Sequence, residues 1–452
     1  MEQSAFHVML VAFGDVFSQP GFQNFVVLLE GWIVAGMRAM TSTALAAHGT
    51  FPKHFATYYR FFSEGAWRPD ALGGALLELV LPFAPRGPLV VAVDDTLARK
   101  TGKNIWGANM HHDPLGWLPN AVAFGHNWVV LAIVIHVPLV ERSVAVPVFW
   151  RLYRSRKTRR GKTGRGGREC KTTGASTAKD HRTRPELAVE LLQTLRKALG
   201  NKRIVHLVGD SAYGGKSITR HLPEHTACIS RLPMSAALYD LPPARRRGQN
   251  GRPRKKGARL KSPEQMAADT TRWRKTTVRL YGKTVWVRYK ARIALWYNSA
   301  GNMPLRIVVV RDPSGRRRDD AFYSTDADMP IEAILETYAK RWSLEVAFRD
   351  TKQQLGLERS QARTRKAVER TGPFAFVAYT MTVAWFCHNG HHHYPTLPIM
   401  PWYRHKRGPS FADMQTLLRR ELLRKRFSHT PANIRPFKKP MRTNTHAQQR
   451  AA

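Results

Sequence analysis

Cysteine, acidic side chains and long apolar runs are all scarce in this sequence. Its 452 residues include three cysteines, which share no metal-ligand spacing and cannot form a disulfide framework, so we expect a protein of a reducing cytoplasm. The longest apolar runs, Val129–Val140 and Phe374–Cys387, are too short to span a bilayer, and the N-terminus lacks the basic region of a secretory signal. These absences predict a cytoplasmic chain with no membrane partner.

Negative charge is the second shortage. Asp and Glu number 32 against 73 Lys and Arg, which gives a formal net charge of +41. Self-repulsion penalises such a charge in a compact protein, so we expect a polyanionic partner, most simply nucleic acid. A structural nucleic-acid binder or a membrane-surface protein would be equally basic, and charge alone does not separate them from an enzyme. Hydrophobic residues make up 43% of the chain, enough for a sizeable core.

The stretch Tyr338–Lys352 carries polar residues at helical spacing within an otherwise apolar segment. At about 100° per residue, Tyr338, Arg341 and Lys352 fall within about 40° of Glu345, so one helix face would carry a carboxylate, two cations and a phenol. A solvated ladder of ion pairs is the ordinary explanation for such a face. Apolar residues crowd the same stripe, however, and an acid that faces a protein interior or a cleft needs a metal ion or a partner cation.

Two apolar stretches upstream each end in aspartate. The run Pro88–Thr96 is rich in β-branched residues and predicts a buried strand with Asp94 and Asp95 at its carboxyl end. Because successive strand side chains point to opposite faces, one of these two acids faces any given site. A second strand, within Arg203–Gly215, ends in Asp210 and a Gly-rich turn that lacks the P-loop and dinucleotide spacings. In isolation, the pair Asp94 and Asp95 could simply end a strand in a solvated turn.

The register of Tyr338, Arg341, Glu345 and Lys352 resembles the helix signature of bacterial insertion-sequence DDE transposases of the cut-and-paste type. The resemblance spans roughly residues 86–400. It implies an α/β fold, namely an RNase H-like mixed sheet flanked by helices, with a β-rich insertion and an N-terminal helical domain.

The same resemblance assigns the chemistry. It implies that Asp94, Asp210 and Glu345 are catalytic and bind metal, and that Asp95 caps or orients. Oxygen-only ligands favour Mg²⁺ or Mn²⁺, and three carboxylates could hold two such ions. The loop Lys100–His126 offers His111, His112, Asp113 and His126. Zinc is not favoured there because these residues lack a helix-borne ligand pair such as His-Glu-x-x-His.

Composition divides the chain into five predicted segments. These are an N-terminal helical DNA-binding domain (1–85), the first part of the core (86–231), a β-rich basic insertion (232–302), the second part of the core (303–400) and a basic C-terminal segment (401–452). The first segment has helical patterns at Phe22–Met37, Phe51–Phe62 and Ala71–Leu81. Its Lys53–Arg60 stretch mixes cations with aromatics, which suits either a helix in a DNA groove or amphipathic packing.

The core and the insertion carry further expected elements. Those of the core are two strands, a helix, a returning strand and a buried helix, at Trp128–Val137, Val144–Leu152, Pro185–Leu199, Pro304–Pro313 and Phe374–Phe386. Those of the insertion are three alternating strands at Thr276–Tyr281, Thr284–Lys290 and Ala291–Tyr297. In some insertion-sequence relatives a tryptophan on the returning strand holds a flipped base. This returning strand has none, so base flipping by that geometry is not expected, and Trp273, Trp286 and Trp296 are predicted to be core residues.

Several cations are candidates for DNA contacts. We expect Arg341 and Lys352 to clamp phosphates while Tyr338 positions the strand. Two basic stretches, Arg151–Arg184 and Ala244–Lys261, have too few apolar residues to bury a core and are predicted to order on phosphates. The second stretch supplies the DNA-binding candidates Arg254, Lys255 and Lys256.

These features predict a DNA transposase that cuts at the ends of an insertion sequence and joins the 3′-hydroxyl ends to target DNA by two-metal phosphoryl transfer. Its partner would be double-stranded DNA, bound by a homodimer in the bacterial cytoplasm at the nucleoid. A metal-dependent endonuclease on the same fold that stops after cleavage shares all the chemistry residues. A catalytically silent DNA-binding protein shares the charge. Both alternatives stay open from sequence.

Overall fold

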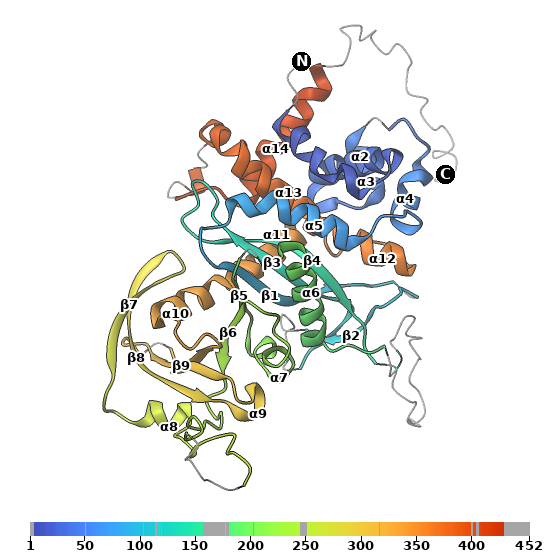
Figure 1. The fold of residues 1–452 in the computed structure, drawn as a ribbon. Helices are drawn as coiled ribbons and strands as arrows, with labels where there is room; N and C mark the ends of the chain where they lie inside the picture. The colour runs from blue at the N-terminus through green and yellow to red at the C-terminus, as the bar shows by residue number, and fades with distance from the viewer. Residues whose placement is uncertain are drawn as a thin grey trace, which may run out of the picture.

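The computed structural model describes residues 4–428 except 50, 103, 114, 115, 117, 119, 157–176, 178, 179, 202, 245–250, 316, 399, 400, 404 and 405. Ten strands form one mixed sheet in the order β2-β3-β1-β5-β6-β10-β9-β8-β7, with β4 paired to β3 (Figure 1). Helices cover the sheet, and the N-terminal and C-terminal helices gather at one end of it (Figure 1). This mixed sheet flanked by helices confirms the predicted RNase H-like α/β class.

The strands are β1 (Leu89–Arg99), β2 (Asn109–His112), β3 (Val122–Ile135), β4 (Val144–Tyr153), β5 (Val205–Val208), β6 (Thr226–Leu232), β7 (Arg274–Leu280), β8 (Lys283–Leu295), β9 (Pro304–Arg311) and β10 (Asp320–Ser324). The first helices are α1 (Ala5–Leu10), α2 (Gln19–Ala35), α3 (Thr41–His48), α4 (Phe55–Ser63), α5 (Pro69–Val80), α6 (Arg184–Leu199) and α7 (Lys216–Thr219). The later helices are α8 (Pro263–Ala268), α9 (Tyr297–Ala300), α10 (Ile331–Lys340), α11 (Trp342–Leu355), α12 (Arg365–Thr371), α13 (Phe374–His388) and α14 (Phe411–Ser428).

Strand β1 is the centre of the core, and its β-branched residues account for that. Val91 and Val93 are fully buried, and β1 pairs antiparallel with β3 and parallel with β5. Sequence reasoning placed Asp94 and Asp95 at the end of this strand, and that placement was wrong. The strand continues through both acids to Arg99 because β3 keeps pairing with it, whereas its pairing with β5 stops at Ala92.

The N-terminal helices pack onto the helices that follow the sheet. Helix α13 is buried on nearly every side, as expected for a helix that is apolar all round. The ring of its Phe374 packs edge-to-face against Phe25, Trp32 and Phe62 of the N-terminal helices. The indole of Trp32 also donates a hydrogen bond to the carbonyl oxygen of Leu355 at the end of α11. The domain boundary at residue 85 stays a prediction, and these contacts show one shared hydrophobic core across it.

The described part of the insertion extends the sheet rather than standing apart from it. The two strands predicted at Thr284–Lys290 and Ala291–Tyr297 are a single strand, β8, because its pairing passes without interruption from β7 to β9. Trp286 was predicted to be a core residue, and that was wrong, because 49% of its surface is exposed on β8. Trp273 and Trp296 are half-buried against the core.

The signature stretch forms two helices rather than the single helix predicted. Helix α10 ends at Lys340 and α11 begins at Trp342, with Arg341 in the junction. The amide of Arg341 donates to the carbonyl of Tyr338, and the amide of Leu344 donates to the carbonyl of Arg341. Both bonds span three residues instead of four, so the chain tightens at Arg341. The C-terminal segment contains helix α14, which the sequence analysis did not predict.

Parts of two predicted basic loops, residues 157–176 and 245–250, and the tail from 429 onward lie outside the described residues. Within the described chain, no single helix has the length and apolarity of a membrane span, and one bent pair of helices, residues 19–38 and 41–48, meets those criteria when taken together.

Candidate active site

Two aspartates meet where the parallel strands separate. The last parallel pair between β1 and β5 joins Ala92 to Val208. Asp94 and Asp210 each lie two residues beyond that pair, so the register carries them to the same level of the sheet. Alternation along β1 also puts the side chain of Asp94 on the same face as that of Ala92. The carboxylate of Asp210 caps the turn that follows β5, accepting hydrogen bonds from the amides of Ala212 at 2.9 Å and Tyr213 at 3.3 Å.

The glutamate reaches this site through an arginine. The guanidinium of Arg341 lies 2.9 Å from the carboxylate of Asp94 and 2.7 Å from that of Glu345. The tightened turn between α10 and α11 therefore places one cation between an acid on a strand and an acid one helical turn further along. Glu345 is the most exposed of the three groups, with 43% of its side-chain surface accessible, while Arg341 and Asp94 are largely buried.

The surroundings of Asp94 disfavour the ionised form of its carboxyl group. Burial raises the pKa of this carboxyl, the charge of Arg341 lowers it and the charges of Asp210 and Asp95 raise it, and the net result is a shift from 3.8 to about 7. The repulsion from Asp210 shows that the two aspartates are close enough to interact. A carboxylate so placed is stabilised by any additional cation that enters the site.

The donor set fits a hard divalent cation. All three candidate ligands are carboxylates, and a guanidinium already occupies the space between two of them. Within the part of the chain that the structure describes, no three His, Cys, Asp or Glu side chains are close enough to hold a metal ion together. The acids therefore present the right oxygen donors, and Arg341 stands where the acids would have to converge.

Asp95 makes its contacts on the other face of β1. Its carboxylate accepts hydrogen bonds from the phenol of Tyr213 at 2.7 Å and the amide of Asn127 at 2.8 Å, and the guanidinium of Arg184 lies 3.4 Å away. These partners leave Asp94 as the aspartate that faces Arg341. Tyr213 lies three residues after Asp210, so its hydrogen bond ties the turn carrying one aspartate to the strand carrying the other.

The two remaining signature residues lie apart from each other. The ring of Tyr338 packs at a tilt against that of Phe322 and lies beneath the guanidinium of Arg341, with Arg231 and Asp210 among its charged neighbours. Burial raises the pKa of its phenol. Lys352 lies further along α11.

Burial lowers the pKa of Lys352, and its charged neighbours are Glu358, Arg99 and Asp113. The structure thus brings Tyr338 to the acids and places Lys352 at the far end of β1. Lys100, near that same end, donates hydrogen bonds to the carbonyl oxygens of Glu358 and Ser360.

The predicted DNA-binding cations of the insertion lie before α8. Arg254 and Lys255 are exposed. The ammonium of Lys256 lies 3.6 Å from the ring centroid of Tyr239 and 5.0 Å from that of Tyr297. The structure places Lys256 with the aromatics of the insertion, and the DNA-binding role of all three cations stays a prediction.

Sequence reasoning missed the residues that hold the aspartates in place. Tyr213 and Asn127 bind Asp95, and Ser230 donates to the carbonyl oxygen of Asp210 at 2.8 Å. The spacing Asp210-x-x-Tyr213 is the one signal that was present, because a tyrosine just after a strand-end acid can reach back across the sheet. Asn127 and Ser230 carry no local signal.

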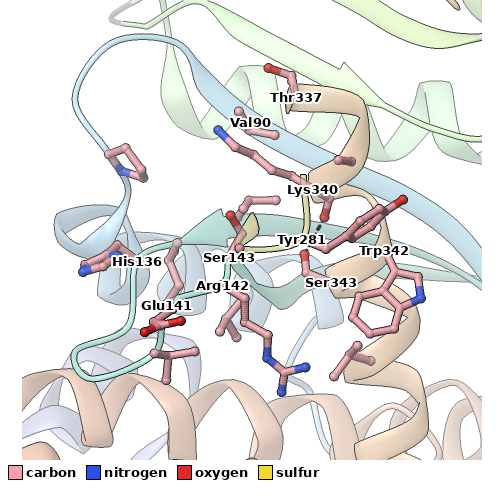
Figure 2. A pocket seen from close by; sticks show the side chains of 18 of the residues that line it. Val90, His136, Glu141, Arg142, Ser143, Tyr281, Thr337, Lys340, Trp342 and Ser343 are labelled. Carbon is pink, nitrogen blue, oxygen red and sulfur yellow. Dashed lines mark hydrogen bonds between the residues drawn. The ribbon is translucent and has the colours of Figure 1, made fainter. Parts of the chain in front are cut away.

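A cleft of about 680 Å³ lies beside the helix pair α10 and α11 (Figure 2). Lys340, Trp342 and Ser343 from the helix pair, Tyr281 from the β7–β8 turn and Arg142 from the β3–β4 loop line it. Asp94, Asp210 and Glu345 are not among its lining residues. Asp94 and Asp210 lie instead where β1 and β5 separate.

Comparison with known families agrees with this geometry. A family model described as DDE superfamily endonuclease matches residues 13–285, and a model described as archaeal putative transposase ISC1217 matches residues 297–385. The first match covers more than half of the chain and contains Asp94 and Asp210, while the second contains Glu345. No curated protein matches the chain.

Proposed function

The chain belongs to the DDE superfamily of endonucleases, and we propose that it is a transposase that cuts DNA at the ends of an insertion sequence and joins the freed 3′-hydroxyl groups to target DNA. One observation carries the proposal. The register of β1 and β5 sets Asp94 and Asp210 side by side, and Arg341 links Asp94 to Glu345. A metal-dependent nuclease or transposase acting on DNA is the coarser statement that family membership supports.

Asp94, Asp210 and Glu345 would hold the divalent ions, Mg²⁺ or Mn²⁺, and two ions are expected because three carboxylates supply enough oxygen donors. Bound ions of this kind polarise the attacking and leaving oxygens of an in-line displacement at phosphorus. No covalent protein nucleophile is then required. Water attacks the scissile phosphodiester and releases a 3′-hydroxyl, which later attacks a phosphodiester of the target.

The remaining side chains orient the DNA. Arg341 is buried between two acids, so it is placed to transfer one of its hydrogen bonds to a phosphate oxygen when metal takes over the acids. Tyr338 lies beside Arg341 and near Asp210, where its phenol can position the strand. Lys352 lies seven residues after Glu345 on α11, which is about 10 Å at a rise of 1.5 Å per residue. It would contact a phosphate away from the cleavage point.

The test is a cleavage assay followed by a joining assay. The protein is incubated with supercoiled plasmid carrying the DNA that flanks its own coding sequence, with Mg²⁺, with Mn²⁺ or with a chelator. Metal-dependent nicking at the element ends is expected, and its absence with both metals would favour a silent DNA-binding protein. Pre-cut ends are then supplied with target plasmid. Cleavage without joining would identify a hydrolytic nuclease on the same fold.

We infer that two chains act together on a pair of DNA ends in the cytoplasm, at the nucleoid. The support is a net charge of +41 that is spread over the N-terminal, central and C-terminal parts of the chain. Mass analysis of the complex with end-containing duplex tests this, combined with mixing of wild-type and Glu345→Gln chains. A single chain in the active complex, or no inhibition by the inactive chain, would contradict pairing.

A further inference from the structure

Strands β7 and β8 form a hairpin with one fully exposed face. Residues alternate along both strands between exposed positions and positions that are half-buried or buried. The register pairs Lys275 with Arg288, Thr277 with Trp286 and Arg279 with Thr284. All six residues are exposed, and none is acidic. We refer to Lys275, Thr277, Arg279, Thr284, Trp286 and Arg288 as the basic hairpin face.

The basic hairpin face lies on the side of the sheet opposite Asp94. Register connects the two regions, because each directly paired residue shares a face with its partner. The Asp94 face runs across the sheet through Ala92, Val208, Ile229, Ser324, Arg306, Ile293 and, along β8, to Val287. Val287 is buried and pairs with Thr276, whose hydroxyl hydrogen-bonds to Glu332 of α10. Trp286 and its neighbours therefore point the other way.

The side chains of the cations on this face make no ion pair within the described part of the chain. Lys275 and Arg288 lie directly opposite each other, and like charges in that arrangement destabilise a pair of strands. Among the described residues, no carboxylate lies within ion-pair distance of Lys275, Arg279 or Arg288. The ammonium of Lys275 lies 5.4 Å from the ring centroid of Trp286, and the carboxylate of Glu336 accepts a hydrogen bond from the backbone amide of Arg279.

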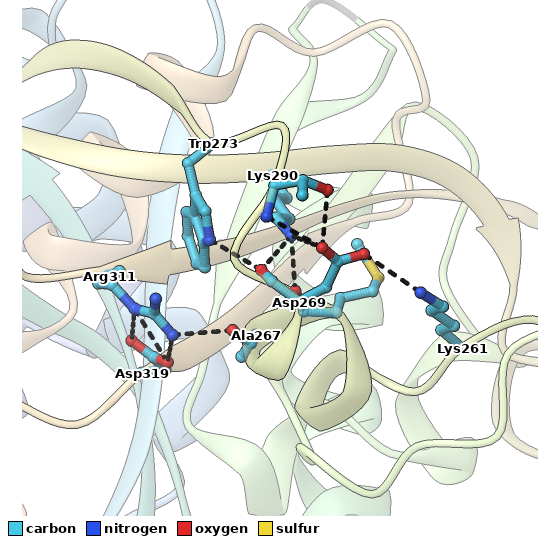
Figure 3. Close-up of polar contacts among 9 residues, drawn as sticks. Lys261, Ala267, Asp269, Trp273, Lys290, Arg311 and Asp319 are labelled. Carbon is cyan, nitrogen blue, oxygen red and sulfur yellow. Dashed lines mark hydrogen bonds and ion pairs between the residues drawn. The ribbon is translucent and has the colours of Figure 1, made fainter.

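Cations nearby on the same sheet face are treated differently (Figure 3). Arg311 of β9 makes a bidentate ion pair with Asp319 and donates to the carbonyl of Ala267. Lys290 of β8 donates to the carbonyl oxygens of Met266 and Asp269, and both cations lie against the ring of Trp273. The protein supplies carboxylate or carbonyl partners to these two cations, whereas no described carboxylate pairs with the side chains of Lys275, Arg279 and Arg288.

We propose that the basic hairpin face binds the sugar–phosphate backbone of duplex DNA. The proposal rests on the proposed function, since it names a second DNA surface for the same enzyme. Phosphate contacts from Lys275, Arg279 and Arg288 would relieve their mutual repulsion, and the hydroxyls of Thr277 and Thr284 are further donors to phosphate oxygens. Trp286 offers an exposed ring for a deoxyribose or base contact.

Because the face lies on the side of the sheet away from Asp94, the duplex bound here is a segment distinct from the one held at the acids. The register spreads the cations along both paired strands, so they can contact several phosphates of one duplex. The contacts go to the backbone, so the binding is independent of sequence.

The experiment measures binding of the full chain to a 40-base-pair duplex of arbitrary sequence, without divalent metal, over a range of salt. One variant combines Lys275→Gln, Arg279→Gln and Arg288→Gln. The control combines Lys197→Gln, Arg420→Gln and Arg424→Gln, which removes the same charge from exposed positions elsewhere. Each lost phosphate contact lowers the log–log salt slope by about 0.9, so the hairpin variant is expected to lose about 2 to 3. Thermal melting of both variants checks folding.

A hairpin variant with the wild-type slope, or a control that loses as much, would overturn the proposal. So would a loss seen with single-stranded DNA of equal length and absent with the duplex. The result is separable from the proposed function. If the slope falls while the wild type shows no metal-dependent cleavage, the surface stands and the transposase assignment fails. If cleavage is present and the slope is unchanged, the transposase assignment stands and the proposal for the basic hairpin face fails.

Discussion

The active-site acids and the basic hairpin face treat charge in opposite ways. On the Asp94 face, the guanidinium of Arg341 is shared between two carboxylates at hydrogen-bonding distance. On the basic hairpin face, Lys275 and Arg288 lie opposite each other with no carboxylate between them. Charges that are neutralised inside the protein set up a reaction centre, whereas charges left without a partner depend on a polyanion from outside.

The largest effect is expected from the acids. Asp94→Asn, Asp210→Asn and Glu345→Gln each remove a charge while preserving shape, and metal-assisted charge stabilisation is worth several kcal/mol. We expect each to lower the cleavage rate by about 10³-fold or more while leaving duplex affinity and its salt slope unchanged. Glu264→Gln, an equal charge change at an exposed position on α8, is the control. Wild-type cleavage by any one variant would remove that residue from the site.

The next effect is a pH dependence of stability on the Asp94 face. The pKa of Asp94 is raised from 3.8 to about 7, chiefly by burial, so the folded protein binds this proton more tightly than the unfolded chain does. Stability from this group is therefore fully present below about pH 4 and falls as pH rises to about 7. A shift of that size corresponds to about 4 kcal/mol at most.

The measurement is thermal unfolding of wild type and Asp94→Asn in metal-free buffer at several pH values. The variant is expected to gain stability relative to wild type across this window, and Mg²⁺ should reduce the difference. Parallel pH profiles for the two proteins would show that Asp94 ionises without opposition and would weaken the case for a site that needs a cation.

Arg341→Gln tests whether the guanidinium of Arg341 stabilises the carboxylates of Asp94 and Glu345. Removing it leaves Asp94 and Glu345 facing each other without a counter-charge, and loss of one partner from a buried pair is costly. Because Glu345 is partly exposed, we expect a loss of about 2 kcal/mol in unfolding free energy, with Mg²⁺ restoring more stability to the variant than to wild type. Arg365→Gln is the matched control.

The control breaks an exposed pair of the same spacing, Arg365 with Glu369, and such pairs are worth about 0 to 1 kcal/mol. Equal losses from Arg341→Gln and Arg365→Gln would show that the bridge between Asp94 and Glu345 is an ordinary surface pair. A loss at Arg341 that Mg²⁺ does not reverse would show that the arginine is structural and does not stand in for a metal ion.

Much of the core could be read from the sequence because the determinants are local. Apolar β-branched residues at Val90–Val93 specify a buried strand, and the acids that follow mark the site. The level at which Asp94 meets Asp210 could not be predicted, since it depends on where pairing between β1 and β5 stops. Beyond that point β1 stays paired with β3 as far as Arg99.

The two corrections in the insertion and the signature helix share a cause. Alternation along β8 predicted a strand but not which of its faces is covered, and Trp286 was assigned to the core because large aromatics usually are. The tightening at Arg341 also lacks a local signal, because no Pro or Gly stands there. In both cases packing against a distant element, such as α10 on β7, decides the outcome.

The smallest effect comes from converting the basic hairpin face into a paired one. Lys275→Glu would place a carboxylate opposite Arg288 and replace a repulsion with an attraction, and cross-strand pairs of this kind contribute about 0.2 to 1 kcal/mol. We expect a small rise in melting temperature without DNA, together with weaker duplex binding and a lower salt slope. Stability and binding would thus move in opposite directions, as expected of charges retained for a partner.

Lys283→Glu is the control, because it makes the same charge change at the hairpin turn opposite Leu280, where no cation faces it. It should leave the melting temperature unchanged or slightly lower. The melting temperature of Lys275→Gln is expected to lie between those of Lys275→Glu and Lys283→Glu, since this change removes the repulsion and adds no attraction. If Lys275→Glu destabilised the free protein as much as Lys283→Glu, the two cations would not repel each other in the folded state, and the contrast between the active-site acids and the basic hairpin face would lose its energetic basis.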